Sequence, residues 1–199
     1  MKKIVLSLVS ILIILNSANA VTYNSEPKIF ISELVADAIK TLSDKSKSKE
    51  NKRKIIEKIA LENVDIKALG YYTLGSIKKN LKPEELDKYN NLFEKYLLKS
   101  LTSRLTDYSS NNFEVLSSEQ KSSNTTIVKS KILESSSSPE ININWRIYTK
   151  NPTKPLIRDL IVEGLSMARV QKEEFGSILS SNNNNINALF KKLENFISN

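Results

Sequence analysis

The side chains that could do covalent chemistry are few in this 199-residue sequence, which contains neither histidine nor cysteine. Their lack excludes a Ser-His-Asp triad, a thiol nucleophile and a zinc site built from imidazole or thiolate ligands. The four glycines are too scattered for a phosphate-binding glycine-rich loop; they are Gly70, Gly75, Gly164 and Gly176. We therefore expect no nucleotide-driven reaction, no resident cofactor and no metal site in this chain.

The best remaining candidates for acid–base chemistry are two carboxylates, Asp159 and Glu163, on one predicted strand. Residues four apart on a strand lie on the same face, with about 13 Å between them. Glycosidase carboxyl pairs are about 5 to 9.5 Å apart, so this pair is too widely spaced for that reaction. We interpret both as solvent-facing or loop-bonding side chains and expect no enzymatic activity.

The sequence is basic, with 30 Lys and Arg against 22 Asp and Glu and a net charge of +8. A Lys-rich stretch over residues 45–58 has the composition of a solvated face. The alternative is that it steers the protein toward anionic lipid headgroups or an acidic partner. Nucleic-acid binding through interleaved aromatic and basic side chains is not expected, because residues 44–58 contain no aromatic residue.

The first twenty residues have the composition of an export signal. Lys2 and Lys3 precede an apolar run from Ile4 to Leu15, and Ala18-Asn19-Ala20 supplies a small-x-small cleavage site. The run of about a dozen residues is short of the roughly 20 needed to span a bilayer. We expect cleavage after Ala20, which removes two lysines and lowers the net charge from +8 to +6, and a single domain over residues 21–199.

The first half of the remaining chain predicts helices. Apolar residues recur at helical spacing over residues 27–43, and a turn over 44–54 leads into a second helix. Asp65 is a candidate cap for a short helix toward Gly70. Pro83 starts a helix of about 25 residues that presents a long apolar wall.

The second half predicts strands over residues 113–117, 125–133, 141–148 and 156–163. Residues 141–148 alternate between apolar side chains and the polar face of Asn142, Asn144, Arg146 and Tyr148. Two further helices follow, one capped by Ser166 and one after the loop 182–185. This order predicts an α+β fold with a curved antiparallel sheet of about four strands, one face of which is covered by helices.

These segments together resemble the MlaC family of periplasmic phospholipid-binding shuttles, also known as toluene-tolerance auxiliary proteins. The resemblance rests on the stretch from Asp159 to Met167 (DLIVEGLSM), which begins within the last predicted strand, and on KEEF at residues 172–175. Upstream, VDIK at residues 64–67 and FEKYL at residues 93–97 also match. The loop 182–185 is asparagine-rich where the family often has glycine, a mild change because asparagine tolerates a left-handed backbone.

The resemblance implies a nuclear-transport-factor-like fold around an apolar cavity that holds the acyl chains of a phospholipid, which is cargo rather than a cofactor. It implies a periplasmic carrier without enzymatic activity; the oligomeric state stays open, with a monomer as the default expectation for a diffusing carrier. The implied partners are an outer-membrane lipoprotein and an inner-membrane ABC transporter with lipid-binding domains. Two alternatives stay open: a carrier of another amphiphile, such as lipoprotein acyl chains, and a docking adaptor with a filled core.

A lipid carrier needs apolar side chains on facing surfaces and no catalytic group. A diacyl phospholipid exposes on the order of 30 methylenes, and leaving them in water costs roughly 20 kcal/mol or more. The predicted lining comes from the long helix, the sheet and the entry to the next helix: Phe93, Leu97, Leu101, Leu105, Ile143, Trp145, Ile147, Leu160, Val162, Leu165 and Met167. For each residue the alternative is ordinary core packing, which uses the same residue types.

Overall fold

The computed structural model describes residues 22–105, 113–134 and 139–199, and the expected export signal lies outside these ranges. No helix within them is long and apolar enough to cross a membrane. The α-helices there are α1 (Pro27–Ser43), α2 (Lys49–Asn63), α3 (Ile66–Leu74), α4 (Pro83–Leu105), α5 (Met167–Ser180) and α6 (Ile186–Ser198). A 3₁₀-helix, η1 (Gly75–Asn80), joins α3 to α4 and was not predicted.

The helices begin where side-chain oxygens accept hydrogen bonds from otherwise unpaired backbone N–H groups. Glu26 accepts from the N–H groups of Lys28 and Ile29 at the start of α1. Asp65 caps α3 by accepting from Ala68, as predicted, although the helix continues past Gly70 to Leu74.

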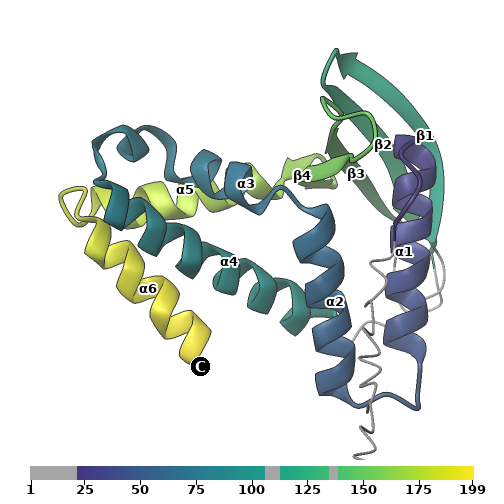
Figure 1. Cartoon of the computed structure of the whole chain (residues 1–199), viewed down its shortest axis with the longest axis horizontal. Coiled ribbons are helices and arrows are strands. Elements are labelled where there is room, and N and C mark those ends of the chain that lie inside the picture. Colours follow the sequence, from purple (N-terminus) through teal and green to yellow (C-terminus); the bar gives the residue numbers. More distant parts are fainter. Residues whose placement is uncertain (1–21, 106–112, 135–138) are drawn as a thin grey trace, which may run out of the picture.

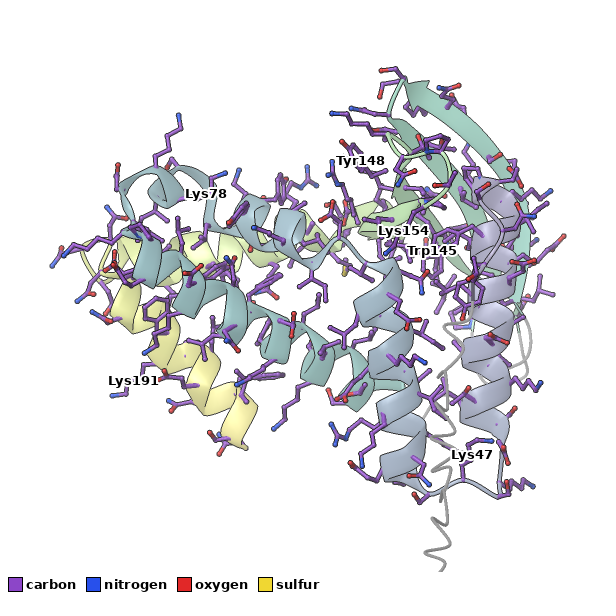
Figure 2. All side chains as sticks on the ribbon, in the orientation of Figure 1. Lys47, Lys78, Trp145, Tyr148, Lys154 and Lys191 are labelled. Atoms are coloured by element: carbon purple, nitrogen blue, oxygen red, sulfur yellow. The ribbon has the colours of Figure 1, made fainter. Side chains whose placement is uncertain are left out.

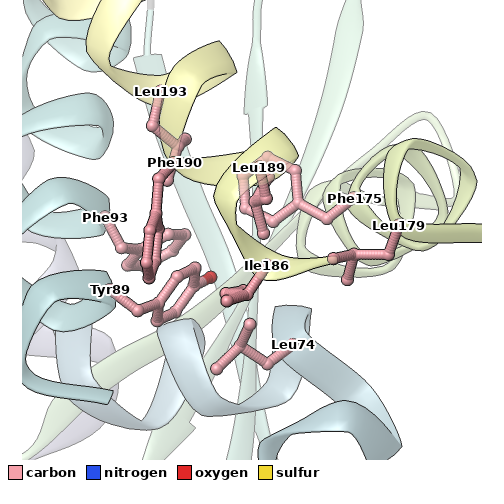
Figure 3. Packing of buried hydrophobic residues seen from close by; sticks show 9 residues of the cluster. All are labelled: Leu74, Tyr89, Phe93, Phe175, Leu179, Ile186, Leu189, Phe190 and Leu193. Carbon is pink, nitrogen blue, oxygen red and sulfur yellow. The ribbon is translucent and has the colours of Figure 1, made fainter. Parts of the chain in front are cut away.

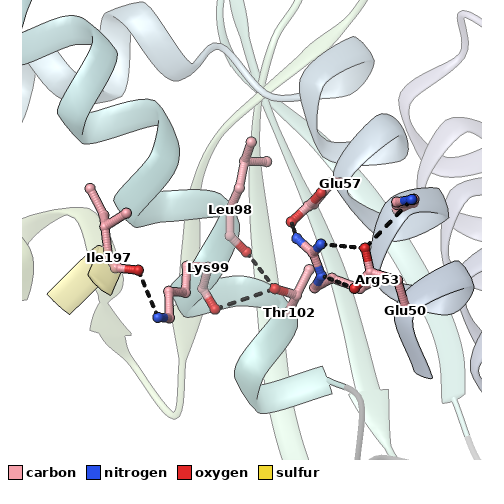
Figure 4. Close-up of polar contacts among 8 residues, drawn as sticks. Glu50, Arg53, Glu57, Leu98, Lys99, Thr102 and Ile197 are labelled. Atoms are coloured by element: carbon pink, nitrogen blue, oxygen red, sulfur yellow. Dashed lines mark hydrogen bonds and ion pairs between the residues drawn. The ribbon is translucent and has the colours of Figure 1, made fainter. Parts of the chain in front are cut away.

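Helix α2 begins at Lys49, earlier than the predicted turn over residues 44–54 would allow. Ser48 caps it by accepting from the backbone N–H of Asn51. Arg53 then binds Glu50 and Glu57 at 2.6 Å each, one helical turn before and after it (Figure 4). The Lys-rich composition suggested a turn, but these i,i+3 and i,i+4 pairs favour the helix.

The last two helices begin at the predicted positions. Ser166 caps α5 by accepting from the N–H of Arg169, and Asn185 caps α6 by accepting from Asn187. In the loop between them Asn183 and Asn184 have φ values of 53° and 57°. Both asparagines therefore adopt the left-handed backbone conformation that we expected asparagine to tolerate in this loop.

One antiparallel sheet in the order β1-β2-β3-β4-β5 follows the helical half of the chain. Its strands are β1 (Phe113–Ser122), β2 (Thr125–Ile132), β3 (Ile141–Tyr148), β4 (Leu156–Val162) and β5 (Leu165–Ser166). Register shifts in β1–β2 pairing and between Arg146 and Ile147 increase the local twist, and the sheet is curved and unclosed (Figure 1). The predicted α+β class and curved antiparallel sheet are confirmed.

One face of the sheet packs against α1 (Figure 1). This cluster, which we call the α1 core, combines Phe30, Ile31 and Leu34 of α1 with Val128, Ile147 and Ile157 of the sheet. Each of these six side chains is buried. Because side chains alternate between the two faces of a strand, Val128 of β2 and Ile147 of β3 point to the same face of the sheet, the one that α1 covers.

A second cluster lies among α3, α4, α5 and α6, which gather on the β4 side of the sheet (Figures 1 and 3). We call it the helical core; its buried members are Leu74, Tyr89, Phe93, Phe175, Leu179, Ile186, Leu189, Phe190 and Leu193. Tyr89 stacks on Phe93, and its hydroxyl lies 2.7 Å from that of Thr73. Burial raises the pKa of the Tyr89 phenol above its usual range.

Candidate functional site

Besides Ile147, which belongs to the α1 core, five of the predicted lipid contacts lie on the same face of the sheet. Trp145 pairs with Leu160 across β3 and β4, Ile143 pairs with Val162, and Val162 pairs with Leu165 across β4 and β5. We call these five residues the apolar sheet patch. Residues that pair directly across strands point to the same side, so their side chains form one continuous surface.

The apolar sheet patch is only partly covered. Ile143, Leu160 and Val162 are half-buried and belong to neither core among the described residues, while Leu165 is 55% exposed. Trp145 is half-buried and packs against the α1 core, so it links that core to the patch. The patch is therefore an apolar surface next to a core rather than part of one.

Trp145 is held in place by a buried hydroxyl. Its indole Nε1 donates to Ser130 Oγ at 2.8 Å, and Ser130 Oγ donates to the carbonyl oxygen of Ile143 at 2.9 Å. Ser130 is 1% exposed, and the ring of Phe113 meets Trp145 edge-on with centroids 6.3 Å apart. Because its polar atom is satisfied inside the sheet, Trp145 can present the rest of its ring to an apolar ligand.

Asp159 fixes the turn that carries Leu165 and Met167. This carboxylate is 6% exposed; it accepts from the hydroxyl of Ser166 at 2.6 Å and from the backbone N–H of Ala168 at 3.0 Å. It thereby ties β4 to the first turn of α5. Met167, which is 36% exposed, starts that helix directly after β5.

Glu163 does not lie on the same strand as Asp159, because β4 ends at Val162. Glu163 has φ 48°, and its carboxylate accepts from the backbone N–H of Asn142. The prediction of loop-bonding carboxylates therefore describes Glu163, whereas Asp159 is buried rather than solvent-facing. No group of three or more metal-ligating side chains occurs in the described ranges.

The predicted residues of α4 lie with the helical core rather than with the sheet patch. Phe93 is 3% exposed, and Leu97 packs against the same cluster. Leu101 is half-buried, and Leu105 ends α4 with its side chain outside the described part of the structure. Ile147, fully buried in the α1 core, is likewise packed. The structure thus divides the predicted lining into a sheet set and a helical set, and their contact with lipid stays a prediction.

Sequence reasoning missed a cavity on the opposite, polar face of the sheet. Its volume is about 490 Å³, and α3, β3, β4 and the start of α5 line it. Arg146, Arg158 and Arg169 border it, and Ile147 is the predicted lipid contact among its lining residues. The alternation that places Arg146 and Tyr148 on a polar face was visible in the sequence, but the approach of α3 and α5 was not.

An open, curved antiparallel sheet with helices packed beside it, and with an apolar patch left half-covered, defines this chain as an α+β protein with a partly exposed apolar surface on its sheet. The sequence matches the MlaC protein family over residues 32–195, and the chain belongs to that family.

A solved structure of a phospholipid-binding protein from Ralstonia solanacearum, in complex with a phospholipid, has the same fold. The two superpose with a TM-score of 0.72 at 14% sequence identity, covering 88% of this chain and 97% of that one. None of the curated proteins with which the sequence was compared matches it.

Proposed function

We propose that this protein is a periplasmic phospholipid carrier that moves lipid between an outer-membrane lipoprotein and an inner-membrane ABC transporter. The observation that carries the proposal is the apolar sheet patch, half-covered in a chain that belongs to the MlaC family. The phospholipid in the R. solanacearum protein of the same fold supports it. The export signal predicted for residues 1–20 supports the periplasmic location.

The energetics of the cargo explain why such a patch is useful. Each methylene removed from water contributes about 0.8 kcal/mol, so acyl chains need an apolar surface throughout the transfer. Trp145, Ile143, Leu160 and Val162 provide branched and aromatic side chains for this contact, and Leu165 extends the patch toward solvent. Leu97 and Leu101 of α4 are the helical residues proposed to meet the chains from the other side.

Loading and release would be passive in this proposal. The sequence has no glycine-rich phosphate-binding loop, so the energy for directional movement would come from the partners. The net positive charge of the chain favours approach to anionic headgroups and acidic protein surfaces.

Lipid extraction and native mass spectrometry of the purified protein test the proposal. We expect about one phospholipid per chain, and we expect Leu165→Glu to abolish its retention because a carboxylate beside acyl chains is strongly disfavoured. Leu116→Glu is the matched control: Leu116 is 42% exposed and lies on β1, away from the patch. Circular dichroism checks that both variants fold.

Three results would contradict the proposal in different ways. Protein that is free of lipid in every preparation would favour the docking adaptor, and acyl chains extracted only as lipoprotein would favour a different cargo. Equal lipid content in Leu165→Glu and Leu116→Glu would remove Leu165 from the site. Because the sequence has one tryptophan, quenching of Trp145 fluorescence by brominated phosphatidylcholine provides an independent measure of contact.

A further inference from the structure

The cavity of about 490 Å³ on the polar face of the sheet lies outside the proposed lipid site. It lies between α3, which contributes Tyr72, and the start of α5, where Ser166 of β5 caps the helix and Arg169 lies in its first turn. Tyr148, whose place on β3 is labelled in Figure 2, borders it from the sheet. Tyr148 and Trp145 are three residues apart on one strand, so their side chains point to opposite faces.

Positive charge dominates the lining of this cavity. Three arginines from three different elements border it: Arg146 of β3, Arg158 of β4 and Arg169 of α5. Asp159 is the one carboxylate among the lining residues, so the described lining carries a net positive charge.

Asp159 lies close to Arg146 but does not hydrogen-bond it. It is 6% exposed and already accepts from Ser166 and Ala168. Its Oδ2 lies 3.9 Å from Nη2 of Arg146, which is beyond hydrogen-bond distance. Arg169 is similarly 3.9 Å from the exposed carboxylate of Glu173. Within the described part of the chain, both guanidinium groups therefore keep donors for a ligand.

Arg158 is held rigidly beside them. Its Nε and Nη2 donate to Oδ2 of Asp65 at 2.8 and 2.7 Å, and its guanidinium lies 3.3 Å from the centroid of the Tyr148 ring. A guanidinium fixed by a carboxylate and an aromatic ring loses little freedom when it binds a further group. The site thus combines one fixed arginine with two that can move to meet a ligand.

We propose that this cavity binds a phosphate-bearing anion, with Arg146 and Arg169 as the main donors. Planar guanidinium groups match phosphate oxygens in pairs of parallel hydrogen bonds, and the hydroxyl of Ser166 and the phenol rings of Tyr72 and Tyr148 suit a small organic phosphate. The volume is within the range of small-ligand sites. The phosphate could belong to a phospholipid headgroup or to a free phosphate compound, and both sources share the same recognition chemistry.

Isothermal titration calorimetry with ligands that have no acyl chain tests the site without involving the apolar sheet patch. The probes are inorganic phosphate, glycerol 3-phosphate and glycerophosphoglycerol, the last being a headgroup diester. Binding of the diester in preference to the other two would identify headgroups, and the reverse would identify free phosphate compounds. Either result supports the proposal, and the affinity should fall as salt is added.

The double variant Arg146→Gln/Arg169→Gln should weaken binding about tenfold or more, since each charge-assisted hydrogen bond contributes substantially. Lys191→Gln/Lys192→Gln removes the same charge from α6 and should leave the affinity unchanged. The proposal is overturned if none of the three probes binds, or if both double variants bind equally well. Lipid retention, measured as above, should persist in Arg146→Gln/Arg169→Gln, which separates this site from the carrier site.

Discussion

Replacing Asp159 by alanine tests how the turn before α5 is held. The substitution leaves the N–H of Ala168 and the hydroxyl of Ser166 without their acceptor in a position that is 6% exposed. Two charge-assisted hydrogen bonds of about 1.5 kcal/mol each give an expected loss of about 3 kcal/mol in the free energy of unfolding. For a chain of this size that corresponds to a fall in Tm of roughly 6–12 °C.

Urea unfolding followed by circular dichroism and by Trp145 fluorescence measures this loss. Asp159→Asn keeps an acceptor for Ala168, so it should cost less than Asp159→Ala, about 1 kcal/mol. Glu173→Ala, on the exposed side of α5, is the matched control and should change the free energy of unfolding by less than about 0.5 kcal/mol. If Asp159→Ala unfolds at the same urea concentration as Glu173→Ala, the carboxylate does not hold α5 to β4.

Two further predictions concern the helical core. Gly70→Ala should lower the free energy of unfolding by about 1 kcal/mol or more, because the new Cβ would lie 3.0 Å from Cδ1 of the buried Phe93 ring. Gly176→Ala should instead raise it by about 0.5–1 kcal/mol, because a Cβ at Gly176 has no neighbour within 4 Å. Thermal melts that shift in the same direction for both variants would contradict this packing argument. Burial raises the pKa of Tyr89, so the unfolded state releases this proton first: stability should be level below about pH 10 and then fall by up to about 1.4 kcal/mol per pH unit. Tyr89→Phe should reduce that alkaline loss in urea titrations at pH 9 to 11, and an unchanged slope would refute the assignment.

Local signals explain why most elements could be predicted from the sequence. Asp65, Ser166 and Asn185 each cap a helix through a hydrogen bond to a neighbouring residue, so the information lies within three positions. The alternation over residues 141–148 likewise identified β3 and its two faces. Strand β1 extends five residues beyond its predicted end at Ser117, because Ser118–Ser122 is a polar segment that resembles a loop and is strand only through pairing with β2.

The site was less predictable because the partners of an apolar residue are not local. Phe93 and Leu160 are both apolar residues at the expected spacing, yet Phe93 is packed in the helical core and Leu160 is half-buried on the sheet. Hydrophobic periodicity shows which side of an element is apolar but not what covers that side. The three arginines of the polar cavity come from three elements, and only the folded chain brings them together.

The separation of the α1 core from the helical core bears on how a guest could enter. At Asp65, which caps α3, a hydrogen bond and an ion pair join the helical part of the chain to β4. The backbone N–H of Asp65 donates to the carbonyl of Ile157 at 2.9 Å, and its carboxylate binds Arg158. Asp159 provides a second junction, because it accepts from Ser166 and from the N–H of Ala168 and so joins β4 to α5. Any displacement of one cluster relative to the other therefore has to stretch both junctions, the one at Asp65 and the one at Asp159.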